Sequence, residues 1–296
     1  MSRGRSVDRR LLVLVGALAL GASSCSAVAG GERVPDEGAP RATAAVQQAG
    51  GDAAGAGAAQ WWTPPAGVAW QWQLSGELDL SVDVPVYDVD WQVAPSVVEE
   101  LHGRGRRAVC YVSVGSWEAH RSDAAAFPEE VLGEPLEGWP DERWLDVRRL
   151  DLLEGPLGHR LDVCRDTGFD AVEPDNVDGY VNRTGFPLTA DDQLVFNRWV
   201  ADQAHRRGMA VGLKNDLDQV AEFVDDVDFA VDEECLQHDE CALLEPFVEA
   251  GKPVLHVEYA LSEEEFCRRE AGLQGFSSML KDLELSAYRH TCPREG

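Results

Sequence analysis

The chain has 296 residues, of which 44% are hydrophobic, enough for one large domain with a substantial core. It carries 53 Asp and Glu against 26 Lys and Arg, which gives a formal net charge of −27 at pH 7. This balance argues against a nucleic-acid partner, because phosphate binding needs a basic surface. It is compatible with a surface that is simply soluble and with one that attracts a cationic substrate.

The first 29 residues have the pattern of a secretion signal. The basic segment SRGRSVDRR precedes the apolar run LLVLVGALALGA, which is short for a bilayer span, and small residues follow it. Two endings fit these residues: cleavage after AVA at 27–29, or a lipobox-like ASSC whose Cys25 would be lipidated. Both predict export from a bacterial cytoplasm, either as a secreted protein or anchored outside the membrane through a lipid on Cys25.

Residues 30–60 are rich in Gly, Ala and Pro and contain no aromatic residue. Such a segment cannot bury enough apolar surface to fold, so we expect a flexible linker. Aromatic residues begin abruptly at Trp61 and Trp62. The folded domain is therefore expected over residues 61–296.

The cysteines predict disulfides. Six remain outside the export segment, an even number in an exported chain, and six cysteines allow 15 connectivities. Sequence spacing favours Cys235 with Cys241 and Cys267 with Cys292, which leaves Cys110 with Cys164. No CxxC or HxxxH spacing points to zinc, so we expect neither a metal nor a cofactor.

Short apolar or alternating runs recur along the domain and predict strands. They occupy residues 69–75, 84–89, 107–115, 169–174, 209–215, 228–234, 253–259 and 276–282. Helix-like segments at 95–105, 191–208 and 264–275 lie between several of them, and each ends at a glycine suited to a helix C-cap. This α/β alternation predicts a single (β/α)8 TIM barrel. An open doubly wound sheet is the alternative, but no Gly-rich phosphate loop follows the first strand.

Polar residues follow every predicted strand except the first. In a barrel these positions share one rim, where catalytic groups lie, so their recurrence favours an active site over an isolated acidic turn. In chain order the residues are Asp88 and Asp90; Ser116 and Glu118; Glu173, Asp175, Asn176 and Asp178; Lys214, Asn215 and Asp216; Asp232, Glu233 and Glu234; Glu258 and Tyr259; and Lys281 and Asp282.

Two carboxyl groups on one rim suit glycoside hydrolysis, because they can divide the roles of acid and of nucleophile or base. Trp and Tyr faces stack on sugar rings, and we expect two or three of the available aromatic residues to do so. The candidates are Trp61, Trp62, Trp70, Trp72, Trp91, Trp117, Trp139 and Tyr180.

Several long motifs resemble the glycoside hydrolase family 114 domain, the endo-α-1,4-polygalactosaminidase-like barrels. They include VYDVDW, CYVSVGSWE, FDAVEPDNVDGY, VGLKNDLDQ, DEECLQHDEC and GKPVLHVEY. The resemblance extends from about Ala69 to Tyr259, nearly the whole predicted domain. It implies a (β/α)8 barrel that hydrolyses α-1,4-linked galactosamine polymers.

The resemblance also implies the catalytic pair, Asp175 in EPDN and Glu233 in DEEC. Glu173 stands where the family pattern commonly has Asp, and Asp232 where it has Asn. We expect a retaining mechanism with Asp175 as nucleophile and Glu233 as acid and base. The substrate-binding candidates are Asp88, Asp90, Ser116, Glu173, Asn176, Asp178, Tyr180, Lys214, Asn215, Asp216, Glu258 and Tyr259.

Galactosamine units carry ammonium groups, so acids such as Asp88, Asp90, Asp178 and Asp216 would attract them. The expected partner is thus a cationic polysaccharide, bound by a monomer. A Schiff-base role for Lys214 is the less favoured interpretation, because a lysine among so many acids is better explained by ion pairing. The alternative function is a carbohydrate-binding barrel without turnover.

Overall fold

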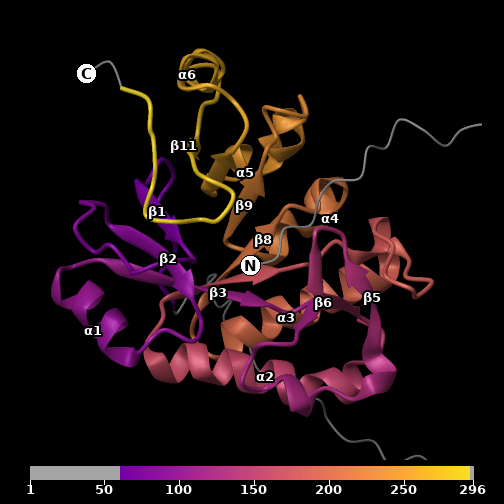
Figure 1. The fold of residues 1–296 in the computed structure, drawn as a ribbon. Helices are drawn as coiled ribbons and strands as arrows, with labels where there is room; N and C mark the ends of the chain where they lie inside the picture. Colours follow the sequence, from indigo (N-terminus) through magenta and orange to yellow (C-terminus); the bar gives the residue numbers. More distant parts are fainter. Residues whose placement is uncertain (1–60, 294–296) are drawn as a thin grey trace, which may run out of the picture. The chain divides into compact units, whose positions relative to one another are not determined.

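The computed structural model describes residues 61–293 (Figure 1). The predicted secretion signal and linker, residues 1–29 and 30–60, lie outside the described residues. So do the last three residues of the predicted domain. Among the residues that are described, no helix is long and apolar enough to cross a membrane.

Eight strands form one sheet in the order β1-β2-β3-β7-β8-β9-β10-β11, and all neighbouring pairs are parallel. Each overlaps one of the eight predicted runs, with β2 and β7 ending one residue beyond theirs, so the predicted (β/α)8 architecture is confirmed. The strands are β1 (Trp70–Gln73), β2 (Val86–Asp90), β3 (Arg107–Ser113), β7 (Ala171–Asp175), β8 (Ala210–Lys214), β9 (Phe229–Glu233), β10 (Val254–Glu258) and β11 (Phe276–Leu280).

The barrel closes between β1 and β11 without a backbone ladder among the residues of these two strands. Instead, the Trp70 indole Nε1 donates to the Ser277 carbonyl at 2.8 Å. The Leu74 amide donates to the Leu285 carbonyl at 2.9 Å, which joins the end of β1 to the segment after β11. A side chain and a loop thus replace the eighth ladder.

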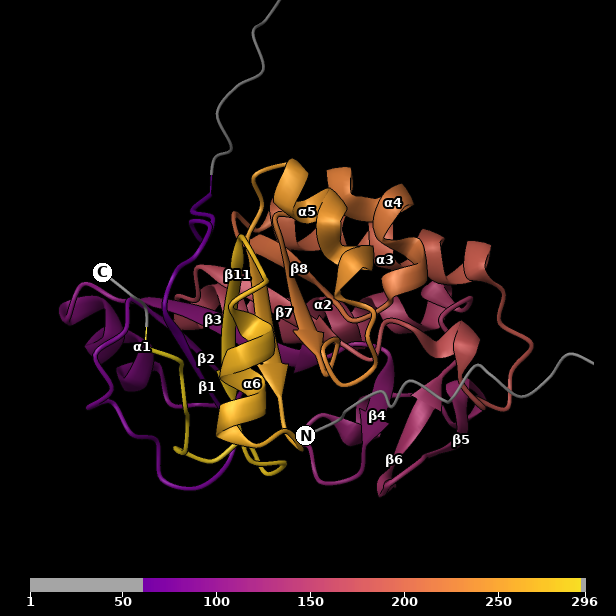
Figure 2. The same cartoon turned by 90° about the horizontal axis from the view of Figure 1, so that it is seen from above.

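Helices lie outside the strands (Figures 1 and 2). The longer ones have clear sequence signals at their ends. Thr189 and Asp192 form a capping box at the start of α3, and Gly168, in the left-handed conformation at φ 97°, ends α2. The α-helices are α1 (Pro95–Gly103), α2 (Leu150–Thr167), α3 (Ala190–Arg206), α4 (Val220–Phe223), α5 (Glu245–Glu249) and α6 (Glu263–Glu270).

Short 3-10 turns join these elements. They occupy Ala124–Ala126, Glu129–Val131, Gly179–Val181, Leu217–Gln219, Val224–Asp226 and Cys241–Leu244.

A second, three-stranded antiparallel sheet stands in the connection between β3 and α2, and the sequence did not predict it. It consists of β4 (Ser116–Glu118), β5 (Leu132–Leu136) and β6 (Trp139–Leu145), in the order β4-β6-β5. Figure 2 shows it beside the barrel, at the ends of the strands. The Leu145 amide donates to the Gly115 carbonyl at 2.9 Å, which ties β6 to the exit of β3.

Alternation along the strands separates two cores. Inward-facing side chains such as Trp70, Val109, Phe229 and Leu255 fill the barrel. Side chains of the opposite parity, such as Cys110, pack against the surrounding helices. Side chains alternate with a period of two, so every second residue of a strand enters the barrel.

All three expected disulfides are present. Cys110 on β3 bonds Cys164 on α2, Cys235 bonds Cys241 just after β9, and Cys267 on α6 bonds Cys292. His256 lies near the second bridge and His290 near the third. The sulfur atoms in both places are already committed to disulfides, which removes the thiolates that a metal would need.

Replacing Cys110 and Cys164 together by alanine is expected to lower the free energy of unfolding by about 4 kcal/mol, because this bridge closes a long loop in the unfolded chain. Its sequence separation is 54, against 6 for Cys235 and Cys241. The same change at the shorter bridge should cost only about 2 kcal/mol. Urea denaturation of the two double variants measures both, and the reverse order of stability would contradict the prediction.

Candidate active site

The inward-facing positions change from apolar to charged toward the carboxyl ends of the strands. Ala171 and Val231 face the barrel interior, and the residues two or four positions further along β7 and β9 have the same parity. These inward charged residues are Asp88 on β2, Glu173 and Asp175 on β7, Lys214 on β8 and Glu233 on β9. The site therefore lies directly above the apolar core of the barrel and is formed by charged residues of the same inward-facing rows.

Lys214 is the centre of this cluster. Its Nζ lies 2.8 Å from Glu173 Oε1, 3.3 Å from Asp175 Oδ1 and 3.4 Å from Glu233 Oε2. The same atom lies 4.5 Å from the centroid of the Trp72 ring, a cation–π contact. Burial disfavours the charge of Lys214, but the carboxylates of Asp175, Glu173 and Glu233 raise its pKa well above the usual range. A permanently charged ammonium thus joins the two expected catalytic carboxylates.

Three donors converge on the Asp175 carboxylate. Tyr111 Oη donates to Oδ2 at 2.7 Å, the Asn176 amide donates to Oδ1 at 2.9 Å, and Lys214 Nζ lies at Oδ1. Burial raises the pKa of Asp175, while Lys214 and the hydrogen bonds oppose that shift. Two hydrogen bonds and an ammonium are the surroundings of an ionised carboxyl group, as the assignment of Asp175 as nucleophile requires.

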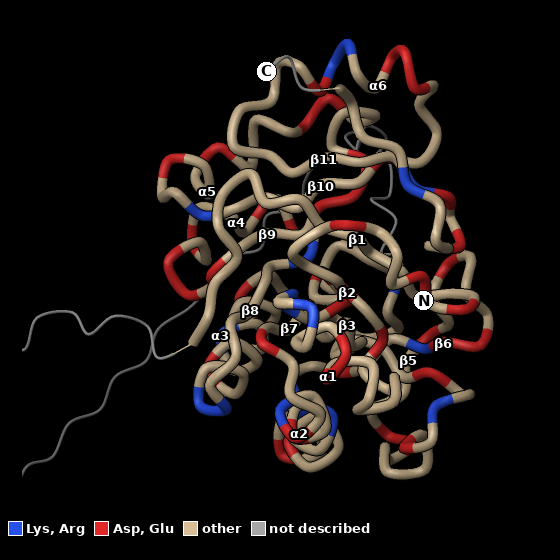
Figure 3. Tube along the Cα trace, turned by 90° about the vertical axis from the view of Figure 1, so that its left-hand side faces the viewer, with Lys and Arg blue, Asp and Glu red and all other residues tan. Residues whose placement is uncertain are grey.

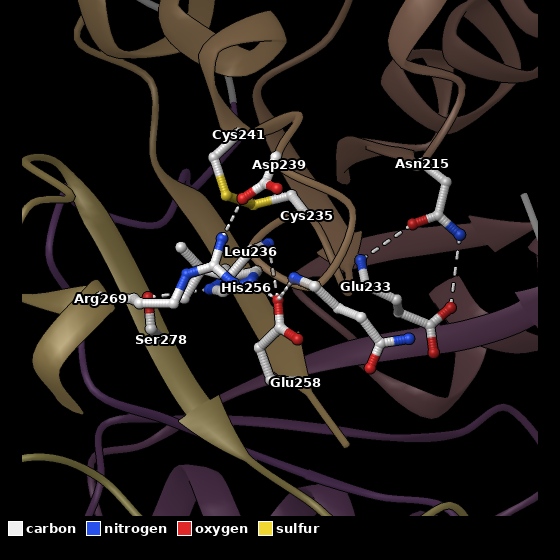
Figure 4. Close-up of a disulfide and its surroundings, with 11 residues drawn as sticks. Asn215, Glu233, Cys235, Leu236, Asp239, Cys241, His256, Glu258, Arg269 and Ser278 are labelled. Atoms are coloured by element: carbon white, nitrogen blue, oxygen red, sulfur yellow. Dashed lines mark hydrogen bonds and ion pairs between the residues drawn. A yellow bond between two sulfur atoms is a disulfide. The ribbon is translucent and has the colours of Figure 1, made fainter. Parts of the chain in front are cut away.

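Glu233 is held from the neighbouring strand exits. Its Oε1 accepts from the Tyr259 hydroxyl, and its Oε2 accepts from Asn215 Nδ2 at 3.3 Å. The Glu233 amide donates in return to Asn215 Oδ1 at 3.0 Å, and Figure 4 shows this reciprocal pair. The Glu233 side chain is 5% exposed and that of Asp175 is 1% exposed. Glu233 is therefore the more accessible of the two carboxyl groups.

The shared ammonium limits the spacing of the two carboxyl groups. One oxygen of Asp175 and one of Glu233 lie 3.3 and 3.4 Å from the same Lys214 Nζ. These oxygens cannot be further apart than the sum of those distances. This limit is compatible with the roughly 5 to 5.5 Å that separates the carboxyl groups of retaining glycosidases.

Left-handed backbone follows three of the four strands that carry the cluster. Asn176 after β7, Asn215 after β8 and Glu234 after β9 have φ values of 64°, 50° and 67°. This conformation is uncommon for residues other than glycine and concentrates at functional sites. Gly115 makes the first of these turns possible, because a Cβ there would lie 1.7 Å from the Asn176 carbonyl oxygen.

The other predicted acidic residues are engaged with protein groups. The Asp90 carboxylate accepts from Arg121 Nη1 at 2.8 Å, and the Asp216 carboxylate accepts from Asn197 Nδ2 at 3.2 Å. Asp88 is fully buried, and its carboxyl group lies within hydrogen-bonding reach of that of Glu173. Asp178 is 7% exposed. The expectation that these four acids form an acidic cleft that attracts ammonium groups stays a prediction.

Two consecutive predicted residues point in different directions. Tyr259 reaches Glu233, whereas Glu258 has the opposite parity and faces outward. Glu258 Oε1 accepts from the Leu236 amide at 2.7 Å and contacts His256 Nε2 at 3.0 Å (Figure 4). The structure therefore does not bring Glu258 to the cluster. Glu258 instead holds the loop after β9, which the Cys235–Cys241 bridge also restrains.

The side of the cluster next to the antiparallel sheet contains two residues that the sequence analysis missed. Tyr111 donates to Asp175. It is an inward-facing residue of β3, and the alternation along that strand could have predicted its place in the site. Glu142 on β6 accepts from Ser116 Oγ at 3.0 Å, and Asn176 Nδ2 donates to the same hydroxyl at 3.0 Å. Burial, with the charges of Glu118 and Asp175, raises the pKa of Glu142 to about 7. No sequence signal located Glu142, because the antiparallel pairing places it there.

Several aromatic candidates pack against other side chains of the protein. Trp61 stacks on His205 at 4.1 Å between ring centroids, and Trp62 lies against Arg107 at the first residue of β3. Trp91 packs under Arg121 and Arg160. Trp72 supports Lys214 inside the barrel, and Tyr180, half-buried just after β7, remains at the rim. The rings of Trp61, Trp62 and Trp91 therefore pack against side chains of the protein itself.

The negative charge is spread over the molecule. Figure 3 shows Asp and Glu along α2, α5, α6 and many loops, well beyond the strand exits. Much of the acidic excess therefore belongs to the outer surface, where it favours solubility.

Replacing Asp178 by asparagine is expected to change how stability depends on pH. Burial, and then the charge of Asp175, raise the pKa of Asp178 to about 6 from its ordinary 3.8. The folded protein therefore binds this proton more tightly than the unfolded chain, and its stability falls as the pH rises from about 4 to 6. The variant should gain about 2 kcal/mol relative to the unmodified protein over that interval. Urea denaturation at both pH values measures this gain, and an equal difference at the two would contradict it.

Comparisons with known proteins agree with this geometry. The model of glycoside-hydrolase family GH114 matches residues 51–296. The crystal structure of Aspergillus fumigatus Ega3 in complex with galactosamine is similar, with 35% sequence identity and a TM-score of 0.75. The similarity covers 78% of this chain and 97% of that chain.

The glycoside hydrolase domain of PelA from Pseudomonas aeruginosa shares the fold, with 14% identity and a TM-score of 0.62 over 75% of this chain and 97% of that chain. The comparison with curated proteins finds no match. The resemblance expected from the motifs is thus confirmed over nearly the whole described domain. The chain has a parallel barrel in which two carboxylates contact one ammonium group. By its match to the family model and its similarity to Ega3, it is a glycoside hydrolase that belongs to family GH114.

Proposed function

We propose that this protein hydrolyses α-1,4-linked galactosamine polymers by a retaining, two-carboxylate mechanism. The proposal depends on one observation: Asp175 and Glu233, at the carboxyl ends of β7 and β9, both lie within ion-pair distance of Lys214. The substrate class follows from family GH114 and from the similarity to Ega3, whose structure contains galactosamine.

In the proposed first step, Asp175 attacks the anomeric carbon while Glu233 gives a proton to the departing glycosidic oxygen. The bond to the leaving sugar breaks and a glycosyl–Asp175 ester forms. In the second step Glu233 takes a proton from water, whose oxygen attacks the anomeric carbon and releases Asp175. The three donors around Asp175 orient its carboxylate for attack, and the greater exposure of Glu233 suits proton exchange with substrate and water.

Export belongs to the same proposal. The signal-like residues 1–29 and the negatively charged domain suit a protein that acts on an extracellular polymer, either freely secreted or anchored through Cys25. The three disulfides support an oxidising compartment.

Incubation with a deacetylated α-1,4-galactosamine polymer is expected to release oligosaccharides detectable by mass spectrometry. A fully N-acetylated polymer serves as the comparison for the ammonium groups, and a β-1,4-glucosamine polymer as the comparison for linkage and sugar. Proton NMR of the first products should show the α configuration, which retention requires. A folded protein that binds the deacetylated polymer without cleaving it would support the binding-barrel alternative, and initial β products would establish inversion.

A further inference from the structure

Asp88 and Glu173 form a carboxyl–carboxyl pair beneath the proposed catalytic residues. Both side chains are completely buried, and the two carboxyl groups lie within hydrogen-bonding reach of each other. Within residues 61–293, no N–H or O–H group of a third residue donates to either Asp88 oxygen or to Glu173 Oε2. The second Glu173 oxygen, Oε1, lies 2.8 Å from Lys214 Nζ.

Such a pair must hold a proton. Two ionised carboxylates have no hydrogen to share, and their repulsion in a buried site is large. Glu173 has the ammonium of Lys214 as a counter-charge, whereas no ion pair of Asp88 exists among the described residues. The proton therefore belongs on Asp88, which becomes the donor, and Glu173 is the ionised acceptor.

The charged groups around Asp88 support this placement. Glu173 and Asp175 approach from β7 and Lys214 from β8. Burial, followed by the charge and hydrogen bond of Glu173, raises the pKa of Asp88 well above its usual range, and the effect of Lys214 is smaller. A buried carboxylic acid that stays neutral at pH 7 in order to donate a hydrogen bond is chemically well precedented.

We propose that Asp88 is a positioning residue, a permanently protonated acid that donates to Glu173 so that Glu173 anchors Lys214 between Asp175 and Glu233. The distances agree with this role. Lys214 Nζ lies closer to Glu173 than to either catalytic carboxylate, at 2.8 Å against 3.3 and 3.4 Å. The ammonium is thus tethered on one side and shared on the other. It can remain in place when Asp175 loses its charge on forming the glycosyl ester.

Infrared difference spectroscopy tests the protonation without any substrate. The spectrum of the protein at pH 7 minus that of Asp88→Asn should contain the C=O band of a protonated carboxyl group. A carboxylate band in its place would overturn the proposal. NMR of the unsubstituted protein with carboxyl-¹³C aspartate gives an independent readout: at least one aspartate should remain protonated at pH 7, and a fully ionised set would overturn the proposal whatever the variant does.

Kinetics test the positioning role and rest on the proposed function. Asp88→Leu keeps a similar size but donates no hydrogen bond, so kcat should fall at least about 30-fold with little change in KM, because a displaced Lys214 affects the transition state. Asp88→Asn retains an N–H donor and should restore most of that loss. Equal losses in the two variants would overturn the positioning role. If the unsubstituted protein cleaves no galactosamine polymer, the proposed function fails, while the spectroscopy still decides the protonation of Asp88.

Discussion

Substitution of Asp175 by asparagine is expected to lower kcat on a galactosamine polymer by at least about a thousandfold, because the amide cannot form the glycosyl ester. Polymer binding should change little, since a nucleophile acts chiefly in the transition state. The single amide oxygen can accept only one of the two hydrogen bonds that Tyr111 and the Asn176 backbone now donate, but the side chain keeps its size, so the fold around it should persist. Initial rates over a range of polymer concentrations separate kcat from KM.

Glu233→Gln provides the matched comparison that assigns the two roles. An aryl galactosaminide with a good leaving group needs no acid in the first step, so Glu233→Gln should still release a burst of phenol from it. Asp175→Asn should release none. Asp191→Asn, an exposed change at the start of α3, serves as the surface control. A burst from Asp175→Asn alone would reverse the assignment, and near-normal turnover in both amide variants would place the catalytic pair elsewhere.

Replacing Lys214 by methionine is expected to have the second large effect, on activity and stability together. Lys214 lowers the pKa of Asp175, so its removal should raise that pKa and move the acidic limb of the kcat/KM profile to higher pH. We expect kcat to fall at least about a hundredfold, because Asp175 and Glu233 lose their common counter-charge. Rates on the polymer from pH 4 to 9 measure both changes.

The stability of the Lys214→Met variant should depend strongly on pH. Removing one partner of a buried ion pair costs about 3 to 5 kcal/mol when the remaining carboxylates are ionised. The loss should therefore be larger at pH 8 than at pH 5, where the carboxyl groups can take up protons. Lys252→Met is the matched control, because Lys252 bonds the backbone carbonyls of Val224 and Val227 and, within residues 61–293, no carboxylate. A pH-independent loss at Lys214 would contradict its role as a counter-ion.

The sequence alone was sufficient to predict the barrel and the rim. The strands of a parallel barrel are buried on both sides and read as short apolar runs, and the polar residues that end each run must come together because the strands are parallel. The six cysteines paired as their spacing suggested. Family motifs placed Asp175 and Glu233 on neighbouring parts of that rim, and Lys214 was already better explained as an ion-paired group than as a Schiff-base residue.

Only the tertiary structure decided which polar groups meet. Asp88, Asp90 and Glu258 all lie in the carboxyl-terminal part of their strands, yet they contact Glu173, Arg121 and the loop after β9. The antiparallel sheet brings Glu142 to Ser116, a contact between residues 26 positions apart that no local pattern encodes. A period of two can be read from the chain, but the partner of a buried charge is set by long-range packing, because several elements must first enclose it.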